Sequence, residues 1–149
     1  MRSTALLLAG IMLVSFRPMA SHGGEFATKD DAKAMALSAA EYLKANGPEV
    51  AFAEFMKPEG AFHDRDLYVT VTDATGVTWA HGTDPAMVGK NHIDLTDADG
   101  APFIRQVLAV KDQGWVDYKW VNPLTNEVQP KATYVVHSEE YWIGVGAYE

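Results

Sequence analysis

The sequence predicts an α+β domain in which helices pack on one side of an antiparallel sheet of five strands. Between residues 28 and 46, apolar residues recur at three- and four-residue spacing, which is typical of an amphipathic helix. Short runs of β-branched and aromatic residues lie between residues 67 and 81 and again between 114 and 148, and turn residues separate them, which is typical of antiparallel strands. A further helical segment is predicted between the second and third strands.

Length and composition limit the kind of protein this is. The chain has 149 residues, a formal net charge of −8 and no cysteine. This length suits one domain with an ordinary core. The negative charge argues against nucleic acid as a partner, because phosphate backbones attract basic surfaces. Without cysteine there is no disulfide, no thiolate zinc site and no cysteine nucleophile.

The first residues predict export. Met1-Arg2 is followed by an apolar run of about 12 residues, which suits a signal peptide and is shorter than the ~20 residues of a membrane span. We predict a signal peptide over residues 1–21, cut near Ala20 or Ser21, and therefore a periplasmic or secreted protein. An uncleaved membrane anchor is the alternative.

The first helix is predicted to begin after a capping motif. Thr28 is followed three residues later by Asp31, a spacing typical of an N-cap with an acidic first turn. Asn46-Gly47-Pro48 predicts its end, and Pro48 predicts the start of a second short helix that ends before Gly60. The apolar stripe of the first helix, rich in alanine, allows close approach to a sheet or to a second copy of the helix; its members are Ala32, Met35, Ala36, Ala39, Tyr42 and Leu43.

The first two strands are predicted over residues 67–72 and 77–81. They are joined by Asp73-Ala-Thr-Gly76, which is typical of a type I turn that ends in a left-handed glycine. Because side chains alternate along a strand, each strand presents two faces. The expected sets are Leu67, Val69 and Val71 against Tyr68, Thr70 and Thr72 in the first strand, and Val77, Trp79 and His81 on one face of the second.

The segment between the two groups of strands is predicted to hold one helical turn near Asp84-Pro85 and then a helix. Thr96 or Asp97 is the predicted cap and Gly114 the predicted end of that helix. Its apolar stripe consists of Phe103, Ile104, Val107 and Leu108. The acidic run 94–100 lacks the ligand spacing of a calcium loop, and the histidines lack the spacing of a zinc motif. We therefore predict no metal and no cofactor.

The last three strands are predicted over residues 114–123, 131–137 and 141–148, as a meander. In the first of them, Tyr118 and Trp120 share a face with Val116. Tyr and Trp combine a large apolar body with one hydrogen-bonding group. Such a face forms either core or the floor of a pocket.

Several of these segments, in this order, resemble the single Cache domain, a PAS-like extracytoplasmic sensor module of bacterial receptors. The segments that carry the resemblance are residues 66–76, His81, 89–91, 114–123, 131–135 and 143–148. The resemblance covers residues 27–149. It implies a PAS-like five-stranded antiparallel sheet with a long N-terminal helix and a helical insertion between strands 2 and 3.

The resemblance also implies a function. Domains of this family bind small carboxylates such as acetate, pyruvate and other short 2-oxo acids, and they are not enzymes. We therefore expect a protein that presents its ligand-bound state to a signalling partner, a membrane receptor or a kinase. A homodimer through the N-terminal helix is a further expectation. Because no second apolar span follows Tyr148, we expect a free-standing exported form.

Lys131 is the central residue of the predicted ligand site, because its ammonium offers three donors to a carboxylate. His81, at the end of a strand, can donate to the same ligand and make binding depend on pH. Lys131 and Tyr134 are three residues apart and lie on opposite faces unless a bulge intervenes, so we expect one of them to lie outside the site. The full predicted set is Tyr68, Trp79, His81, Tyr118, Trp120, Lys131 and Tyr134.

Each of these residues has a purely structural alternative. Lys131 can be a solvated lysine after a turn, the aromatic residues can be core, and His81 can be a hydrogen-bonded loop residue. A structural or accessory periplasmic subunit is the corresponding alternative function, and a small enzyme using His81 with Asp64 or Asp66 is a third. A closed, polar pocket between the sheet and residues 82–103 favours the ligand binder, whereas an exposed apolar helix stripe favours the subunit.

Overall fold

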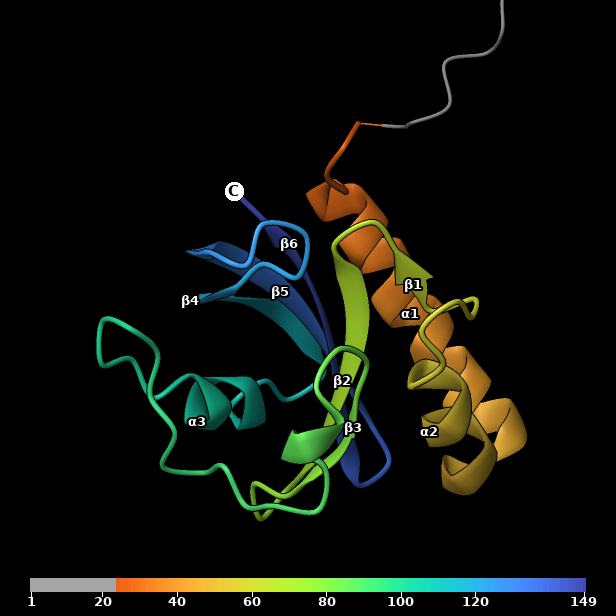
Figure 1. Cartoon of the computed structure of the whole chain (residues 1–149). Coiled ribbons are helices and arrows are strands. Elements are labelled where there is room, and N and C mark those ends of the chain that lie inside the picture. Colours follow the sequence, from red (N-terminus) through yellow and green to blue (C-terminus); the bar gives the residue numbers. More distant parts are fainter. Residues whose placement is uncertain (1–23) are drawn as a thin grey trace, which may run out of the picture.

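The computed structural model describes residues 24–149, so the predicted signal peptide over residues 1–21 lies outside the described residues. Two helices come first and three long strands come last (Figure 1). The elements are α1 Lys29–Asn46, α2 Pro48–Phe55, β1 His63–Asp64, β2 Leu67–Asp73, β3 Thr78–His81, the 3₁₀ turn η1 Pro85–Met87, α3 Phe103–Leu108, β4 Gln113–Val121, β5 Val128–Ser138 and β6 Tyr141–Tyr148. Within the described residues, no helix combines the length and apolar composition that a membrane crossing requires.

The five predicted strands form one antiparallel sheet, in which β2 lies between β3 and β6, and β5 lies between β6 and β4. The two-residue β1 adds a short antiparallel pair at the start of β2. The first long strand and the last are therefore neighbours in the middle of the sheet, and β3 and β4 form its edges. The predicted α+β, PAS-like arrangement is confirmed.

Helices cover both faces of this sheet, which corrects the expectation of helices on one side. In Figure 1, α1 and α2 lie on one side of the strands and α3 lies on the other. The larger apolar core lies under α1 and α2, and a smaller cluster of Val107, Val116 and Val135 lies under α3. The cavity described below lies on the α3 side.

The predicted capping of α1 is confirmed. The Thr28 hydroxyl accepts from the Asp31 N–H at 3.2 Å, and the Asp31 carboxylate accepts from the Thr28 N–H at 2.9 Å. α1 buries Ala32, Ala36, Ala39 and Leu43, and the small size of the three alanines lets the helix backbone lie close to β5 and β6. Pro48 occupies the first turn of α2, where its missing N–H costs no hydrogen bond.

The β2–β3 turn forms as predicted, with Gly76 at φ 95° and its N–H donating to the Asp73 carbonyl at 3.0 Å. The return strand departs from the prediction. The pairing of β3 with β2 changes register between Val71 and Thr72, which marks a bulge at Trp79. As a result Trp79 and His81 lie on opposite faces of the sheet, although an unbroken alternation would place them together.

The cap predicted for α3 is wrong. α3 begins after Pro102 without a side-chain cap and ends at Leu108, before the chain enters β4 at Gln113. Asp97 instead closes the loop that precedes the helix, because its carboxylate accepts from the backbone N–H groups of Asp99, Ala101 and Lys119 at 2.8 to 2.9 Å. The bond to Lys119 ties this loop to the edge strand of the sheet.

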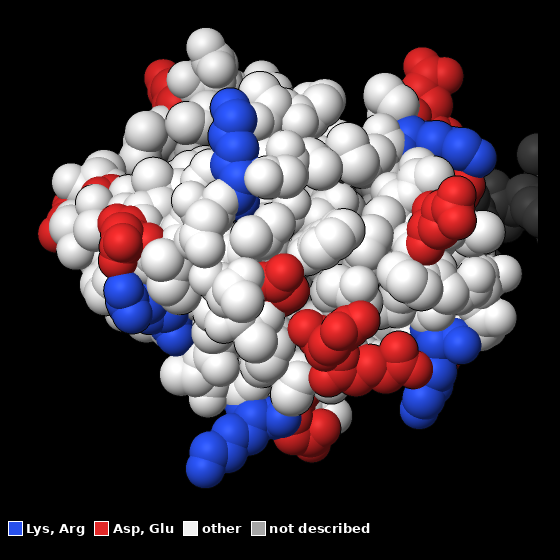
Figure 2. Space-filling model, turned by 90° about the horizontal axis from the view of Figure 1, so that it is seen from below, with Lys and Arg blue, Asp and Glu red and all other residues white. Residues whose placement is uncertain are grey.

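The surface of the molecule is mixed in charge. On the face drawn in Figure 2, acidic side chains gather near the middle and basic side chains lie apart from one another. Among residues 24–149, no group of three or more His, Cys, Asp or Glu side chains could hold a metal ion.

Candidate ligand-binding site

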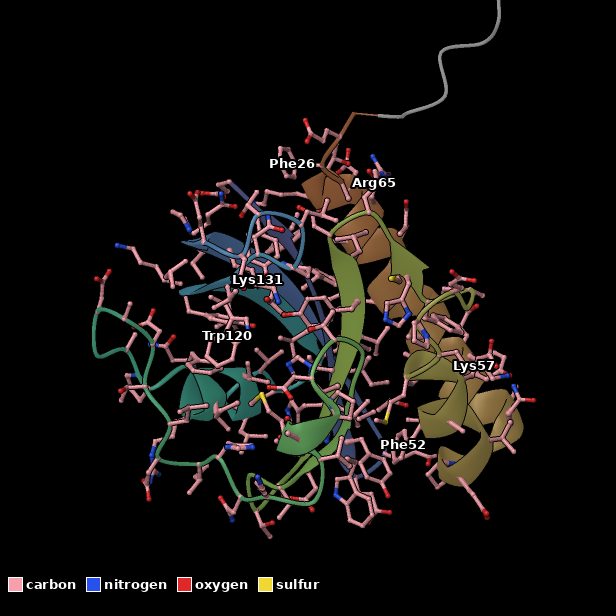
Figure 3. The ribbon with its side chains drawn as sticks, viewed as in Figure 1. Phe26, Phe52, Lys57, Arg65, Trp120 and Lys131 are labelled. Carbon is pink, nitrogen blue, oxygen red and sulfur yellow. The ribbon has the colours of Figure 1, made fainter. Side chains whose placement is uncertain are left out.

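A small cavity lies between the α3 side of the sheet and the chain from β3 to α3. Its volume is about 40 Å³. That is room for about three water molecules, since one occupies 10–15 Å³ by this measure. Its walls come from five strands and the segment between them: Tyr68, Thr70, Thr72, Thr78, His81, Met87, Phe103, Ile104, Val107, Tyr118, Trp120, Lys131, Thr133 and Gly144. Figure 3 shows Lys131 in the interior and Trp120 beside it on the α3 side.

Lys131 is the charged group of this cavity. It is 3% exposed, although lysine is rarely buried. Its ammonium donates to the Tyr68 hydroxyl at 2.9 Å and lies 4.2 Å from the ring centre of Tyr68 and 5.0 Å from that of Tyr148. None of the ion pairs within residues 24–149 includes Lys131. Burial lowers the pKa of Lys131, and the Tyr118 hydroxyl and the Asp66 charge oppose that shift.

The hydroxyl groups next to Lys131 form a chain with one direction. The Tyr148 hydroxyl donates to the Val121 carbonyl at 2.6 Å, so its contact with Tyr68 at 3.2 Å must be one in which Tyr68 donates. Tyr68 in turn accepts from Lys131. Both tyrosine hydrogens are therefore used inside the protein. Of the three N–H donors of Lys131, one goes to Tyr68 and one is directed toward the Tyr118 hydroxyl, which leaves one for a ligand.

His81 presents a second donor to the cavity. Its Nδ1 accepts from the Asp84 N–H at 3.0 Å, which leaves the proton of the neutral ring on Nε2. The side chain is 5% exposed, and its ring lies 5.1 Å from that of Tyr68. Burial, and then the charge of Lys131, lower the pKa of His81 to about 4. At neutral pH the ring is therefore uncharged and acts as a hydrogen-bond donor.

Tyr118 and Trp120 close the cavity from β4. The Tyr118 ring stacks on Phe103 of α3 at 4.5 Å with an interplanar angle of 15°, and Trp120 lies 5.2 Å from the same ring. The Tyr118 hydroxyl accepts from Thr133 at 3.1 Å and keeps its own hydrogen for another acceptor. β4 thus contributes one further donor and an apolar wall.

Two of the predicted residues lie on the opposite face of the sheet. Tyr134 packs in the core under α1, and its hydroxyl contacts Gln113, because β5 runs without a bulge from Lys131 to Tyr134. Trp79 lies 6.4 Å from the ring of Phe52 and donates from Nε1 to Asp73 at 2.8 Å. Trp79 and Tyr134 therefore lie outside this cavity; for Trp79 this corrects the prediction, and for Tyr134 it is the separation from Lys131 that strand alternation led us to expect. The other five, Tyr68, His81, Tyr118, Trp120 and Lys131, meet in one cavity.

Sequence reasoning missed several residues of the site. Thr70 and Thr72 share the face of Tyr68 by strand alternation, and this pattern was sufficient to find them. Tyr148 is the direct cross-strand partner of Lys131. Thr133 shares the face of Lys131 by the same alternation in β5. Met87 carried no recognisable signal, because its position depends on how the loop meets the sheet.

The polar groups around the cavity include one buried cation and several hydrogen-bond donors. Besides the donors used inside the protein, the cavity presents one N–H group of Lys131, Nε2–H of His81 and the Tyr118 hydroxyl, together with the hydroxyls of Thr72 and Thr78, which can donate or accept. No acidic side chain from residues 24–149 lines it. The enzyme alternative requires a carboxylate that binds His81. Asp64 instead pairs with Arg65 at 2.9 Å, and Asp66 accepts from the Ala27 N–H at 2.9 Å, so neither carboxylate serves His81.

Comparison with known proteins agrees with this architecture. The family model of the single Cache domain 2 matches residues 19–149. The sensor histidine kinase MctS of Rhizobium johnstonii is 32% identical over 90 residues, which are 58% of this chain and 20% of the kinase. The chain therefore spans one fifth of the length of that relative.

Solved structures share the fold. A methyl-accepting chemotaxis protein from Vibrio parahaemolyticus superposes with a TM-score of 0.71 at 22% identity, over 80% of this chain and 87% of that one. A Cache chemosensory domain described for carboxylic acid recognition has a TM-score of 0.62 at 24% identity, over 80% and 86% of the two chains. The Cache sensor family is extracytoplasmic and generally non-enzymatic. The chain belongs to the single Cache domain family of sensor domains.

Proposed function

We propose that this protein is an exported sensor that binds a short carboxylate in the cavity around Lys131 and presents the bound state to a signalling partner. The observation that carries the proposal is the buried ammonium of Lys131, which has no carboxylate partner within residues 24–149. A buried charge is costly unless it is paired. A ligand carboxylate would supply the missing charge and accept from three different side chains.

The size of the cavity limits the ligand. Room for about three water molecules suits an acid of two or three carbons, such as acetate or pyruvate, better than a long or branched one. The aromatic wall of Phe103, Tyr118 and Trp120 offers an apolar surface to the rest of such a ligand. The related Cache domain described for carboxylic acid recognition supports the same ligand class.

The compartment and the partner complete the proposal. The apolar run near the N-terminus supports a signal peptide over residues 1–21 and a ligand-binding domain over residues 27–149, in the periplasm or outside the cell. The partner would be a membrane receptor or a kinase, since the matching relative is a sensor histidine kinase. The exposed side of α1 is the proposed contact, in a homodimer or with that partner.

Thermal unfolding against a panel of short carboxylates, amino acids and divalent metals tests the proposal. A ligand that binds only the folded protein, at 100 times its Kd, adds about 2.7 kcal/mol of stability and raises Tm by several degrees. We expect this shift with acetate or pyruvate and not with glutarate, which exceeds the cavity. An unchanged Tm across the whole panel would contradict the proposal and favour the accessory-subunit alternative.

A further inference from the structure

Two glycines of β6 lie beneath the cavity, Gly144 opposite Val135 and Gly146 opposite Thr133 of β5. Neither belongs to the glycines with positive φ in the described chain, which are Gly47, Gly76, Gly89 and Gly100. Backbone conformation therefore does not require glycine at either position. The presence of glycine at position 146 is explained instead by the side chains packed above it.

The space above Gly146 is filled by the side chain of Lys131. A Cβ atom at residue 146 would lie 2.3 Å from Cε and 2.9 Å from Cγ of Lys131, and 2.4 Å from Oγ1 of Thr133. Contacts this short do not occur in folded proteins, so an alanine here would displace a neighbour. Lys131 is in register with Tyr148, so its aliphatic stem crosses to the neighbouring strand and runs over Gly146.

The stem has little freedom to move elsewhere. Lys131 is 3% exposed, and its ammonium lies within 4.2 to 5.8 Å of the ring centres of Tyr68, Tyr148 and Tyr118. These rings are themselves held by the Tyr148 bond to Val121 and the Thr133 bond to Tyr118. The aliphatic stem of Lys131 therefore occupies the space that a side chain at residue 146 would need.

We infer that Gly146 is a positioning residue of the ligand site, which holds the stem of Lys131 against the sheet and directs its ammonium into the cavity. The inference rests on the proposed function for its link to ligand binding, and on geometry for the placement of the lysine. By contrast, Gly144 lines the cavity itself, and a Cβ there would meet only Thr133 Cγ2 and Thr70 Oγ1 at 3.0 and 3.1 Å.

The first test needs no ligand. The pKa of Lys131 is followed by NMR in protein carrying ¹³C-labelled lysine, for the native chain and for Gly146→Ala. Burial lowers this pKa in the native protein, so displacement of the ammonium toward solvent should raise it toward the ordinary value of 10.5. Gly114→Ala is the matched control, a strand glycine with nothing within 4 Å of its Cβ position. An unchanged Lys131 pKa in Gly146→Ala would overturn the inference.

The second test uses acetate and a double-mutant cycle with Lys131→Met. We expect Gly146→Ala to weaken acetate binding at least tenfold, and to cause no additional loss when Lys131 is already methionine. Additive losses would mean that the alanine acts elsewhere, and would overturn the inference. If native protein does not bind acetate or any other acid of the panel, the proposed function fails, while the NMR comparison still decides the role of Gly146.

If Gly146→Ala does not fold, a double variant tests the same inference through thermal unfolding. The added Lys131→Ala substitution would then remove the stem that the new methyl group meets. We expect this double variant to regain a cooperative thermal transition. Failure to regain it would show that Gly146 serves Thr133 or the backbone, and would contradict a role in placing the lysine.

Discussion

The two faces of the sheet differ in chemistry although the same strands build both. Under α1 and α2 the face is apolar, with Val69, Val71 and Ile143 completely buried beneath alanine and phenylalanine side chains. Under α3 the buried side chains include Lys131 and His81, and a cavity remains among them. The main apolar core and the proposed ligand site thus lie on opposite faces of the same sheet.

Strand β2 shows how this separation arises. Leu67, Val69 and Val71 point into the helix-covered core, whereas Tyr68, Thr70 and Thr72 face the cavity. Because side chains alternate with a period of two, each face can change without repacking the other. The comparison therefore predicts that substitutions on the helix face affect folding and those on the cavity face affect binding.

Phe55→Ala on the helix face should have the largest effect on stability. Its side chain is 0% exposed and packs edge-on against Phe62 at 4.8 Å. Loss of a buried phenylalanine costs about 3 to 5 kcal/mol, because a cavity remains. Urea unfolding measures this loss. A loss below about 1 kcal/mol, the range of a surface substitution, would mean that the core under α2 is not a source of stability.

The buried His81 should make stability depend on pH. Its pKa is about 4 in the folded protein against 6.5 in the unfolded chain. As pH falls from 6.5 to 4, the unfolded state binds the proton first, so the free energy of unfolding should decrease by about 3 kcal/mol at most. Urea unfolding of the native protein and of His81→Gln at several pH values tests this. Identical pH profiles would contradict a buried neutral ring.

Tyr118→Phe on the cavity face should have the smallest effect of the three. The substitution removes one donor to the ligand and leaves the ring stacked on Phe103, so acetate binding should weaken about tenfold. The free energy of unfolding should change by no more than about 1 kcal/mol. Calorimetric titration and urea unfolding of the same variant separate the two effects. A large loss of stability with unchanged affinity would reverse the assignment of the faces.

Periodicity was sufficient for much of the fold. Small and apolar residues at helical spacing predicted α1, and alternation in β2 predicted both of its faces. Alternation also predicted that Lys131 and Tyr134 would separate, and they do. These features depend on neighbours within one element, which a single sequence displays.

The errors concern features that form between elements. Trp79 faces the helices because a bulge in β3 shifts its pairing with β2. The residues of this bulge have no sequence pattern that would predict it. Asp97 has a side chain suited to a cap, but it lies well before the start of α3 at Phe103 and binds the backbone of Lys119 in a distant strand. The cavity likewise depends on the packing of α3 against β4, which no local pattern contains.

The most direct test of the central claim is calorimetric titration of acetate and pyruvate into the native protein and into Lys131→Met. The account predicts measurable binding of at least one acid to the native protein. It predicts a loss of about 100-fold or more in the variant, because the ligand charge would be buried without its partner. Equal affinity in the two proteins, with both folded, would contradict the claim that the buried ammonium of Lys131 binds the ligand.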